Sequence, residues 1–113
     1  MTDTDVLHRL SATLAERRGA DPKSSYVASL YAKGTDTICK KVAEEAAETI
    51  MAAKENDAAK IVWELADLWF HSLVLAHHFD LSVDDILAEL RRREGVSGIE
   101  EKNARTHGQE QAH

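Results

Sequence analysis

Two pairs of acidic residues at helical spacing are the part of this chain best suited to chemistry. Glu45 and Glu48 form one pair, and Glu64 and Asp67 form the other. Side chains three residues apart lie on the same side of a helix, so each pair would bring two carboxylates together. Because like charges repel at this spacing, a bound divalent cation is the usual reason to place them there. Oxygen-only ligands suit Mg²⁺ or Mn²⁺ and not zinc, so the pattern favours a site for one of these two ions.

A second interpretation of these pairs stays open at this point. Acidic side chains at this spacing are common on solvated helix faces, where they bind no metal. Two such pairs on consecutive helices, each beside an apolar stripe, are less common than a single pair. The pattern alone therefore leaves a metal site and a solvated acidic face as alternatives.

A carboxylate-bound Mg²⁺ would suit hydrolysis of a phosphoanhydride, because that reaction needs charge neutralisation on phosphate oxygens and a positioned water. A carboxylate not fully used as a ligand could accept the proton of that water. His71, one turn after Asp67, is a candidate metal ligand, substrate contact or core histidine. The chain has no Gly-x-x-x-x-Gly-Lys phosphate loop. The basic candidates for phosphate contacts are Lys33, Lys40, Lys41, Arg91, Arg92, Arg93, Lys102 and Arg105.

The composition indicates one small domain, residues 1–113, with a net charge of −6. That charge argues against nucleic acid as the main partner. The single cysteine excludes an intrachain disulfide. The N-terminus has no apolar signal segment, and charged residues and histidines interrupt the most apolar stretch, residues 61–79. We therefore expect no membrane span and a cytoplasmic location.

One proline and five glycines, among abundant Ala, Leu, Glu and Lys, predict an all-α protein. Ser24 or Ser25 is expected to cap the second helix, and Asp57 the fourth. The last residues, about 106–113, have little to bury and are expected to form a flexible tail. The five expected helices cover about residues 5–18, 26–33, 35–56, 58–79 and 83–93.

The tight turn at Asn56–Asp57 makes the two long helices an antiparallel hairpin, which allows their acidic flanks to meet. The first long helix is expected to bury an apolar stripe formed by Ile38, Val42, Ala46, Ile50 and Ala53. The second is apolar on two faces, around Leu65 and around Trp63, and such a helix is usually buried on both sides. In so small a protein we expect a homodimer that completes a helical bundle. The alternative is packing on another helix of the same chain.

Four segments of the chain resemble signatures of the phosphoribosyl-ATP pyrophosphohydrolase family. They follow one another in the family's order, and the similarity extends from Leu7 to about Arg105. The segments are SYVASLYAKG at residues 25–34, KKVAEEAAET at 40–49, ELADLWFHSLVL at 64–75 and RRREGVSGIEEK at 91–102.

The resemblance implies roles for the acidic residues. The family is one of the MazG-like all-α pyrophosphohydrolases, whose pattern is Glu-x-x-Glu followed by Glu-x-x-Asp. Glu45, Glu48, Glu64 and Asp67 match this pattern, which implies that they are Mg²⁺ ligands. Glu44 matches an additional acidic position, so it is also a catalytic candidate.

The resemblance also implies a reaction. Phosphoribosyl-ATP and water would give phosphoribosyl-AMP and pyrophosphate, which is the second step of histidine biosynthesis. The chain has no segment resembling the cyclohydrolase that is fused to this domain in some relatives, so a stand-alone enzyme is expected.

Two other functions remain as alternatives. A MazG-like pyrophosphatase acting on dNTPs would share the acidic pairs, but residues 25–34 and 97–102 favour the phosphoribosyl-ATP enzyme. A non-enzymatic dimeric helical module would have no Mg²⁺-linked stabilisation.

Overall fold

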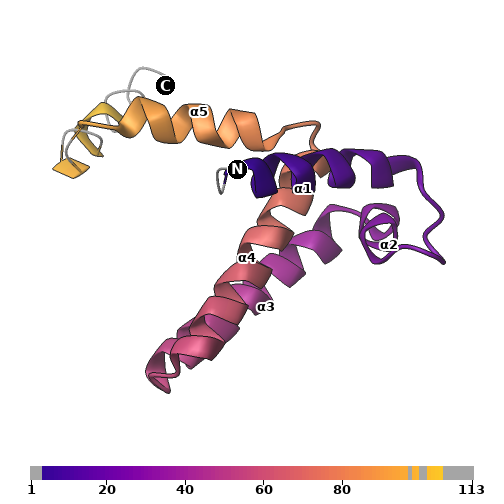
Figure 1. Ribbon diagram of the computed structural model, residues 1–113, viewed down its shortest axis with the longest axis horizontal. Helices are drawn as coiled ribbons and strands as arrows, with labels where there is room; N and C mark the ends of the chain where they lie inside the picture. The colour runs from indigo at the N-terminus through magenta and orange to yellow at the C-terminus, as the bar shows by residue number, and fades with distance from the viewer. Residues whose placement is uncertain (1–3, 97, 100–101, 106–113) are drawn as a thin grey trace. The chain divides into compact units, whose positions relative to one another are not determined.

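The computed structural model describes residues 4–96, 98–99 and 102–105, so the expected flexible tail lies outside the described residues. The predicted all-α class is confirmed, since no strand occurs in these ranges (Figure 1). The elements are α1 (Thr4–Glu16), the 3₁₀ turn η1 (Arg17–Gly19), α2 (Tyr26–Lys33), α3 (Thr35–Lys54), α4 (Ala58–His78) and α5 (Val83–Arg93).

Two of these helices begin at the capping residues that the sequence predicted. The Ser25 hydroxyl accepts a hydrogen bond from the Ala28 amide at 3.1 Å, which caps α2. The Asp57 carboxylate accepts one from the Lys60 amide at 3.2 Å, which caps α4. Both caps satisfy amide groups that have no partner within their own helix.

The α3–α4 hairpin is the frame of the molecule, and its two helices lie side by side and antiparallel (Figure 1). The α3 helix ends at Lys54, two residues before the expected position, because Asn56 adopts a left-handed conformation with φ of 57°. At the other end of α3, Gly34 alone separates it from α2. Its φ of 96° is a conformation that side chains other than glycine's rarely allow.

The helices α1 and α2 pack on one end of the hairpin. The α1 helix packs on α4, and α2 packs on α3. The fully buried side chains come from three different helices, namely Leu14, Ile38 and Val74. Tyr31 of α2 donates a hydrogen bond to the Leu14 carbonyl at 3.0 Å, which ties α2 to α1.

The hairpin buries only part of the expected apolar stripe of α3, since Ile38 is fully buried and Val42 and Ala46 are half-buried. Ile50 of α3 and Trp69 of α4 are each 60% exposed, and Ala53 is also exposed. Glu45 and His71 are instead 6% and 5% exposed. The expected burial of Ile50 and Ala53 is therefore wrong, because the flank that carries Glu45 faces inward in their place.

The chain divides into two compact units, which meet in sequence at Val83, and each is described by itself. In the second unit, α5 carries an ion-paired cluster in which Glu89 contacts Arg92 at 2.7 Å and Arg93 at 3.2 Å. These two guanidinium groups lower the pKa of Glu89 to about 2. Among the described residues, none of the helices combines the length and the apolar character that crossing a bilayer requires.

Candidate metal centre

Three of the four acidic candidates meet between the two helices of the hairpin. Glu45 and Glu48 come from α3 and Glu64 from α4, and one carboxylate oxygen of each lies within 4.8 Å of the other two. Glu45 is buried, Glu64 is half-buried and Glu48 is exposed, so the cluster opens to solvent on one side. Asp67 is half-buried one turn further along α4 and is not part of this closest group.

Two oxygens of the cluster are buried without any hydrogen-bond partner, Glu45 Oε2 and Glu64 Oε2. Burying a carboxylate oxygen without a partner is costly, and buried polar atoms in folded proteins nearly always have one. The surroundings of the Glu64 carboxyl also change its pKa. Burial first, and then the neighbouring carboxylates of Glu48 and Glu45, raise its pKa to about 7.

These features fit a divalent cation bound by oxygen ligands. Mg²⁺ takes carboxylate ligands and keeps several waters, which an exposed side of the cluster allows. A cation would supply partners for the two unpaired oxygens and would remove the repulsion among the three carboxylates. The residues present therefore fit the metal that the sequence predicted.

Lys41 lies beside this cluster and is ion-paired with one of its carboxylates. Its Nζ is 3.5 Å from Glu45 Oε1 and 3.4 Å from Glu44 Oε2. Burial lowers the pKa of Lys41, but Tyr26, Glu44 and Glu45 together raise it above its ordinary value. Lys40 is 76% exposed and lies 3.9 Å from Glu44, so it takes only a peripheral part.

His71 lies one turn after Asp67 and is buried, with both ring nitrogens bonded. Its Nδ1 is 2.8 Å from the Asp67 carbonyl oxygen, and its Nε2 is 2.8 Å from the Tyr26 hydroxyl. Sequence reasoning named His71 but missed Tyr26, which comes from α2, 45 positions earlier. Its place in the segment 25–34 was the available signal.

Comparison with known proteins identifies the family. The family model for phosphoribosyl-ATP pyrophosphohydrolase matches residues 7–94. A "Phosphoribosyl-ATP pyrophosphatase" of Aromatoleum aromaticum is 76% identical over 106 residues, covering 94% of this chain and 98% of the relative. One from Azoarcus sp. is 75% identical, with 93% and 98% covered, and one from Nitrosospira multiformis is 55% identical, with 96% and 89% covered. The chain belongs to the phosphoribosyl-ATP pyrophosphohydrolase family. The resemblance inferred from the four segments, and with it the prediction of a hydrolase, is confirmed.

The family match covers both helices that carry the acidic cluster. It includes Lys33, which is exposed at the end of α2. It does not include Lys102, which is exposed in the second compact unit. Beside the cluster, a hollow of about 200 Å³ is lined by Glu48, Met51, Ala52, Glu55, Lys60 and Glu64. Lys60, which sequence reasoning did not select, is therefore a further cation on the edge of this pyrophosphohydrolase's candidate site.

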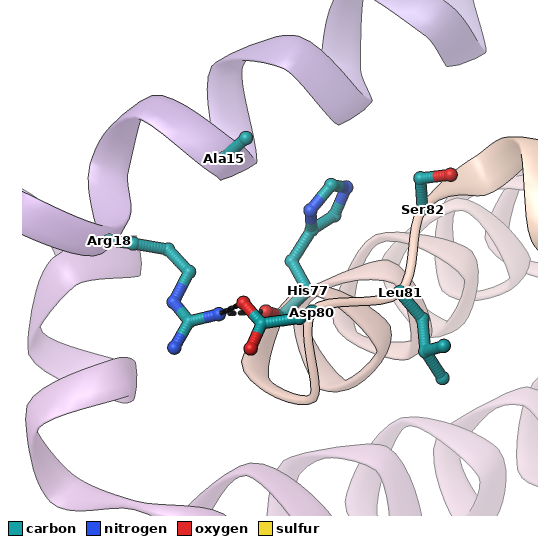
Figure 2. A pocket seen from close by; sticks show the side chains of 6 residues that line it. All are labelled: Ala15, Arg18, His77, Asp80, Leu81 and Ser82. Carbon is teal, nitrogen blue, oxygen red and sulfur yellow. Dashed lines mark hydrogen bonds and ion pairs between the residues drawn. The ribbon is translucent and has the colours of Figure 1, made fainter.

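A larger hollow of about 400 Å³ lies elsewhere, at the end of α4. Figure 2 shows its lining residues, with the Arg18 guanidinium pointing at the Asp80 carboxylate and the His77 carbonyl. The buried His77 Nε2 is 2.6 Å from the Ser11 hydroxyl. Because Arg18 is neutralised by Asp80 and His77 already has a partner, this hollow offers no unpaired group for a substrate, and its size does not make it the site. Its lining is Ala15, Arg18, His77, Asp80, Leu81 and Ser82.

Proposed function

We propose that this chain hydrolyses phosphoribosyl-ATP, breaking the α–β phosphoanhydride bond. Water is consumed, and the products are phosphoribosyl-AMP and pyrophosphate, which is the second step of histidine biosynthesis and a reaction of the cytoplasm. The observation that carries the proposal is the pair of unpartnered buried oxygens on Glu45 and Glu64, inside the region that matches the family.

In this proposal Glu45, Glu48, Glu64 and Asp67 hold Mg²⁺. The ion would neutralise charge on the phosphate oxygens and make the attacking water more acidic. Asp67 follows Glu64 by three residues on α4, so its carboxylate projects from the same side of the helix and would be the fourth ligand. The open side of the cluster, at Glu48, is where the substrate phosphates enter.

Lys41 contacts the phosphates in this proposal, because its ammonium group is ion-paired with Glu45 of the cluster. Glu44 shares Lys41 with Glu45, so it keeps the ammonium group close to the reacting phosphates and belongs to the catalytic group. A carboxylate of the cluster accepts the proton of the attacking water. The cations of the site, Mg²⁺ and Lys41, would balance the negative charge of the leaving pyrophosphate. Lys33, Lys40 and Lys102 are further proposed phosphate contacts, and His71 is proposed to support the substrate site from beneath.

Release of pyrophosphate from phosphoribosyl-ATP tests the proposal. The assay is run with Mg²⁺ and with excess EDTA, beside a panel of dNTPs, on protein whose helical content is verified. Mg²⁺-dependent release from phosphoribosyl-ATP is the expected result. Turnover of dNTPs with none of phosphoribosyl-ATP would instead favour the dNTP pyrophosphatase, and no turnover of either would favour a non-enzymatic module.

We also propose that the enzyme is a homodimer that pairs two hairpins through their outer faces. Val62, Leu65 and Trp69 share one side of α4 and are exposed, and Trp63, on the other apolar face of the same helix, is 70% exposed. Ile50 and Met51 of α3 are also exposed, at 60% and 61%. Several exposed large apolar side chains on one pair of helices are typical of a protein–protein interface, and a second hairpin would complete a four-helix bundle.

Light scattering after gel filtration tests the dimer. The wild-type chain is expected at twice its monomer mass at micromolar concentration, and Trp69→Glu is expected to shift it toward monomer. A control change at the exposed Lys54 of the same hairpin, Lys54→Glu, is expected to leave the dimer intact. A monomeric wild-type chain would contradict this proposal without touching the proposed reaction.

A further inference from the structure

Two lysines of the hairpin flank the acidic cluster from opposite ends. On α3, Lys41 precedes Glu45 by one turn. On α4, Lys60 precedes Glu64 by one turn. Because the two helices run antiparallel, Lys41 lies on the side away from the turn of the hairpin, and Lys60 lies beside that turn (Figure 1). A polyphosphate bound across the cluster can therefore meet a different ammonium group on each side.

The end of the cluster beside the turn is hollowed. The hollow of about 200 Å³ is lined by two carboxylates of the cluster, Glu48 and Glu64, and by the cation Lys60. Its other lining residues are Met51, Ala52 and Glu55. Pockets that take a whole drug-sized ligand measure about 300–1,000 Å³, so this hollow fits a part of a nucleotide and not all of it.

The lining of this hollow suits the diphosphate part of the substrate better than the base. Bases stack on aromatic side chains, and none of the described residues that line the hollow is aromatic. An ion held by Glu48 and by the unpartnered oxygen of Glu64 would neutralise these carboxylates. The ammonium group of Lys60 would then be the cation that the hollow offers to phosphate oxygens.

The opposite end of the cluster has the aromatic groups that the hollow lacks. Tyr26 of α2 is 53% exposed, and its hydroxyl is 2.8 Å from Nε2 of the buried His71. His71 follows Glu64 by two turns on α4, so this pair lies on the side away from the hairpin turn. The nucleoside part of the substrate thus has a suitable surface at one end of the cluster, and the diphosphate has the hollow at the other.

Lys60 has a fixed backbone and an ammonium group that can change partners. Its amide donates to the Asp57 carboxylate at 3.2 Å, in the cap that begins α4. Its Nζ donates to Glu55 Oε2 at 3.0 Å, and the two side chains are 61% and 54% exposed. An ion pair this open to solvent is weak, so a more highly charged phosphate group can replace the carboxylate.

We propose that this hollow is the binding site of the diphosphate that leaves in the reaction, and that Lys60 is the substrate-binding residue that contacts it. The β and γ phosphates lie in the hollow, the bond that breaks lies at the carboxylates, and the nucleoside lies on the side of Tyr26. Glu55 pairs with Lys60 in the absence of substrate and releases it to the diphosphate. The inference rests on the proposed function, because it assigns each part of that substrate to one end of the cluster.

Calorimetry of pyrophosphate binding to the full chain, with Mg²⁺ in excess over pyrophosphate, tests the inference without turnover. Lys60→Met is expected to weaken binding about tenfold, because a hydrogen bond between charged groups is lost. Lys54→Met is the matched control, since Lys54 is exposed at the same end of the hairpin and does not line the hollow. It is expected to stay within about twofold of wild type. Equal affinities of wild type and Lys60→Met, or no binding to wild type, would overturn the inference.

The other member of the ion pair distinguishes binding of the diphosphate from a purely structural pair. Glu55→Gln and Lys60→Met both break the ion pair, but their effects on pyrophosphate affinity are expected to be opposite. Glu55→Gln removes the carboxylate that competes for Lys60, so it should tighten binding about threefold. Weaker binding in both variants would mean that the pair only supports the turn, and would overturn the inference.

Steady-state hydrolysis of phosphoribosyl-ATP separates this inference from the proposed function. In an active enzyme, Lys60→Met is expected to raise KM about tenfold and the inhibition constant of pyrophosphate by a similar factor. Both constants unchanged in an active enzyme would overturn the inference alone. A wild type that binds pyrophosphate through Lys60 but does not act on phosphoribosyl-ATP would support the inference and contradict only the proposed function.

Discussion

The acidic cluster between α3 and α4 and the His77 cluster at the end of α4 both bury polar side chains, but they differ in how these are paired. At the His77 cluster the Ser11 hydroxyl bonds His77 Nε2 and also accepts from the Val83 amide at 3.3 Å. Around it, Arg18 donates to the His77 carbonyl at 2.7 Å. At the acidic cluster, by contrast, two carboxylate oxygens are buried with no partner.

The difference separates a structural cluster from a functional one. A satisfied buried network fixes the packing of α1 against α4 and needs nothing else. An unsatisfied group of like charges costs stability and is retained where a ligand completes it. The larger hollow lies at the satisfied cluster, so the state of the polar atoms identifies the site and the size of the hollow does not.

The largest effect on activity is expected from charge-removing substitutions in the acidic cluster. Glu45→Gln and Glu64→Gln are each expected to lower kcat/KM by at least about a hundredfold, because metal binding loses a ligand charge. The helical fold should remain, since repulsion among the carboxylates falls. Glu16→Gln on α1 is the matched control. Pyrophosphate release measures the effect, and wild-type rates from both cluster variants would remove these residues from the ligand set.

The opposite pattern is expected at the His77 cluster. Ser11→Ala deprives His77 Nε2 and the Val83 amide of a partner, so it is expected to lower the free energy of unfolding by about 1–3 kcal/mol. Because the acidic cluster is untouched, kcat/KM should stay within about twofold of wild type. Urea denaturation and the hydrolysis assay measure the two effects. A large loss of activity in a folded Ser11→Ala protein would contradict the purely structural role of the His77 cluster.

The two clusters are also expected to respond to pH in opposite directions. The raised pKa of Glu64 means that its stabilising contribution is complete below about pH 4.5 and is lost as pH rises through about 7. Burial first, and then Arg18, lower the pKa of His77, so its contribution is complete above about pH 6.5 and is lost as pH falls below it.

Urea unfolding of the metal-free protein between pH 5 and 8 measures these contributions. As pH rises, the free energy of unfolding of Glu64→Gln is expected to increase relative to that of wild type. His77→Gln is expected to be less stable than wild type at high pH, and this difference should shrink as pH falls. Parallel pH curves for wild type and Glu64→Gln would mean that the carboxylates do not interact as inferred.

The smallest effect is expected from Arg18→Met at the rim of the larger hollow. Its ion pair with Asp80 is open to solvent, with Asp80 86% exposed, and such pairs contribute little. Loss of the bond to the His77 carbonyl adds to this, so the change in unfolding free energy is expected to be about 1 kcal/mol or less. Denaturation midpoints measure it, and a loss as large as that of Ser11→Ala would show that the rim and the buried network act as one unit.

The sequence predicted the helices and the chemistry better than the faces that the helices bury. The caps at Ser25 and Asp57 are local and could be predicted from neighbouring residues. The burial of Glu45 in place of Ile50 could not, because periodicity cannot distinguish an apolar stripe that faces the core from one that faces outward. The pairing of Tyr26 with His71 and of Ser11 with His77 joins distant positions, which a single sequence does not reveal.

Binding of Mg²⁺ to the purified protein, measured by calorimetry on wild type and Glu64→Gln, tests the central claim most directly. The account predicts a saturable site in the wild type and an affinity at least about tenfold weaker in the variant. It also predicts that Mg²⁺ at one hundred times the wild-type dissociation constant stabilises the wild type by about 2.7 kcal/mol and the variant by about 1.4 kcal/mol or less. Equal affinity in the two proteins, or no binding to either, would contradict the assignment of the acidic cluster as the metal centre.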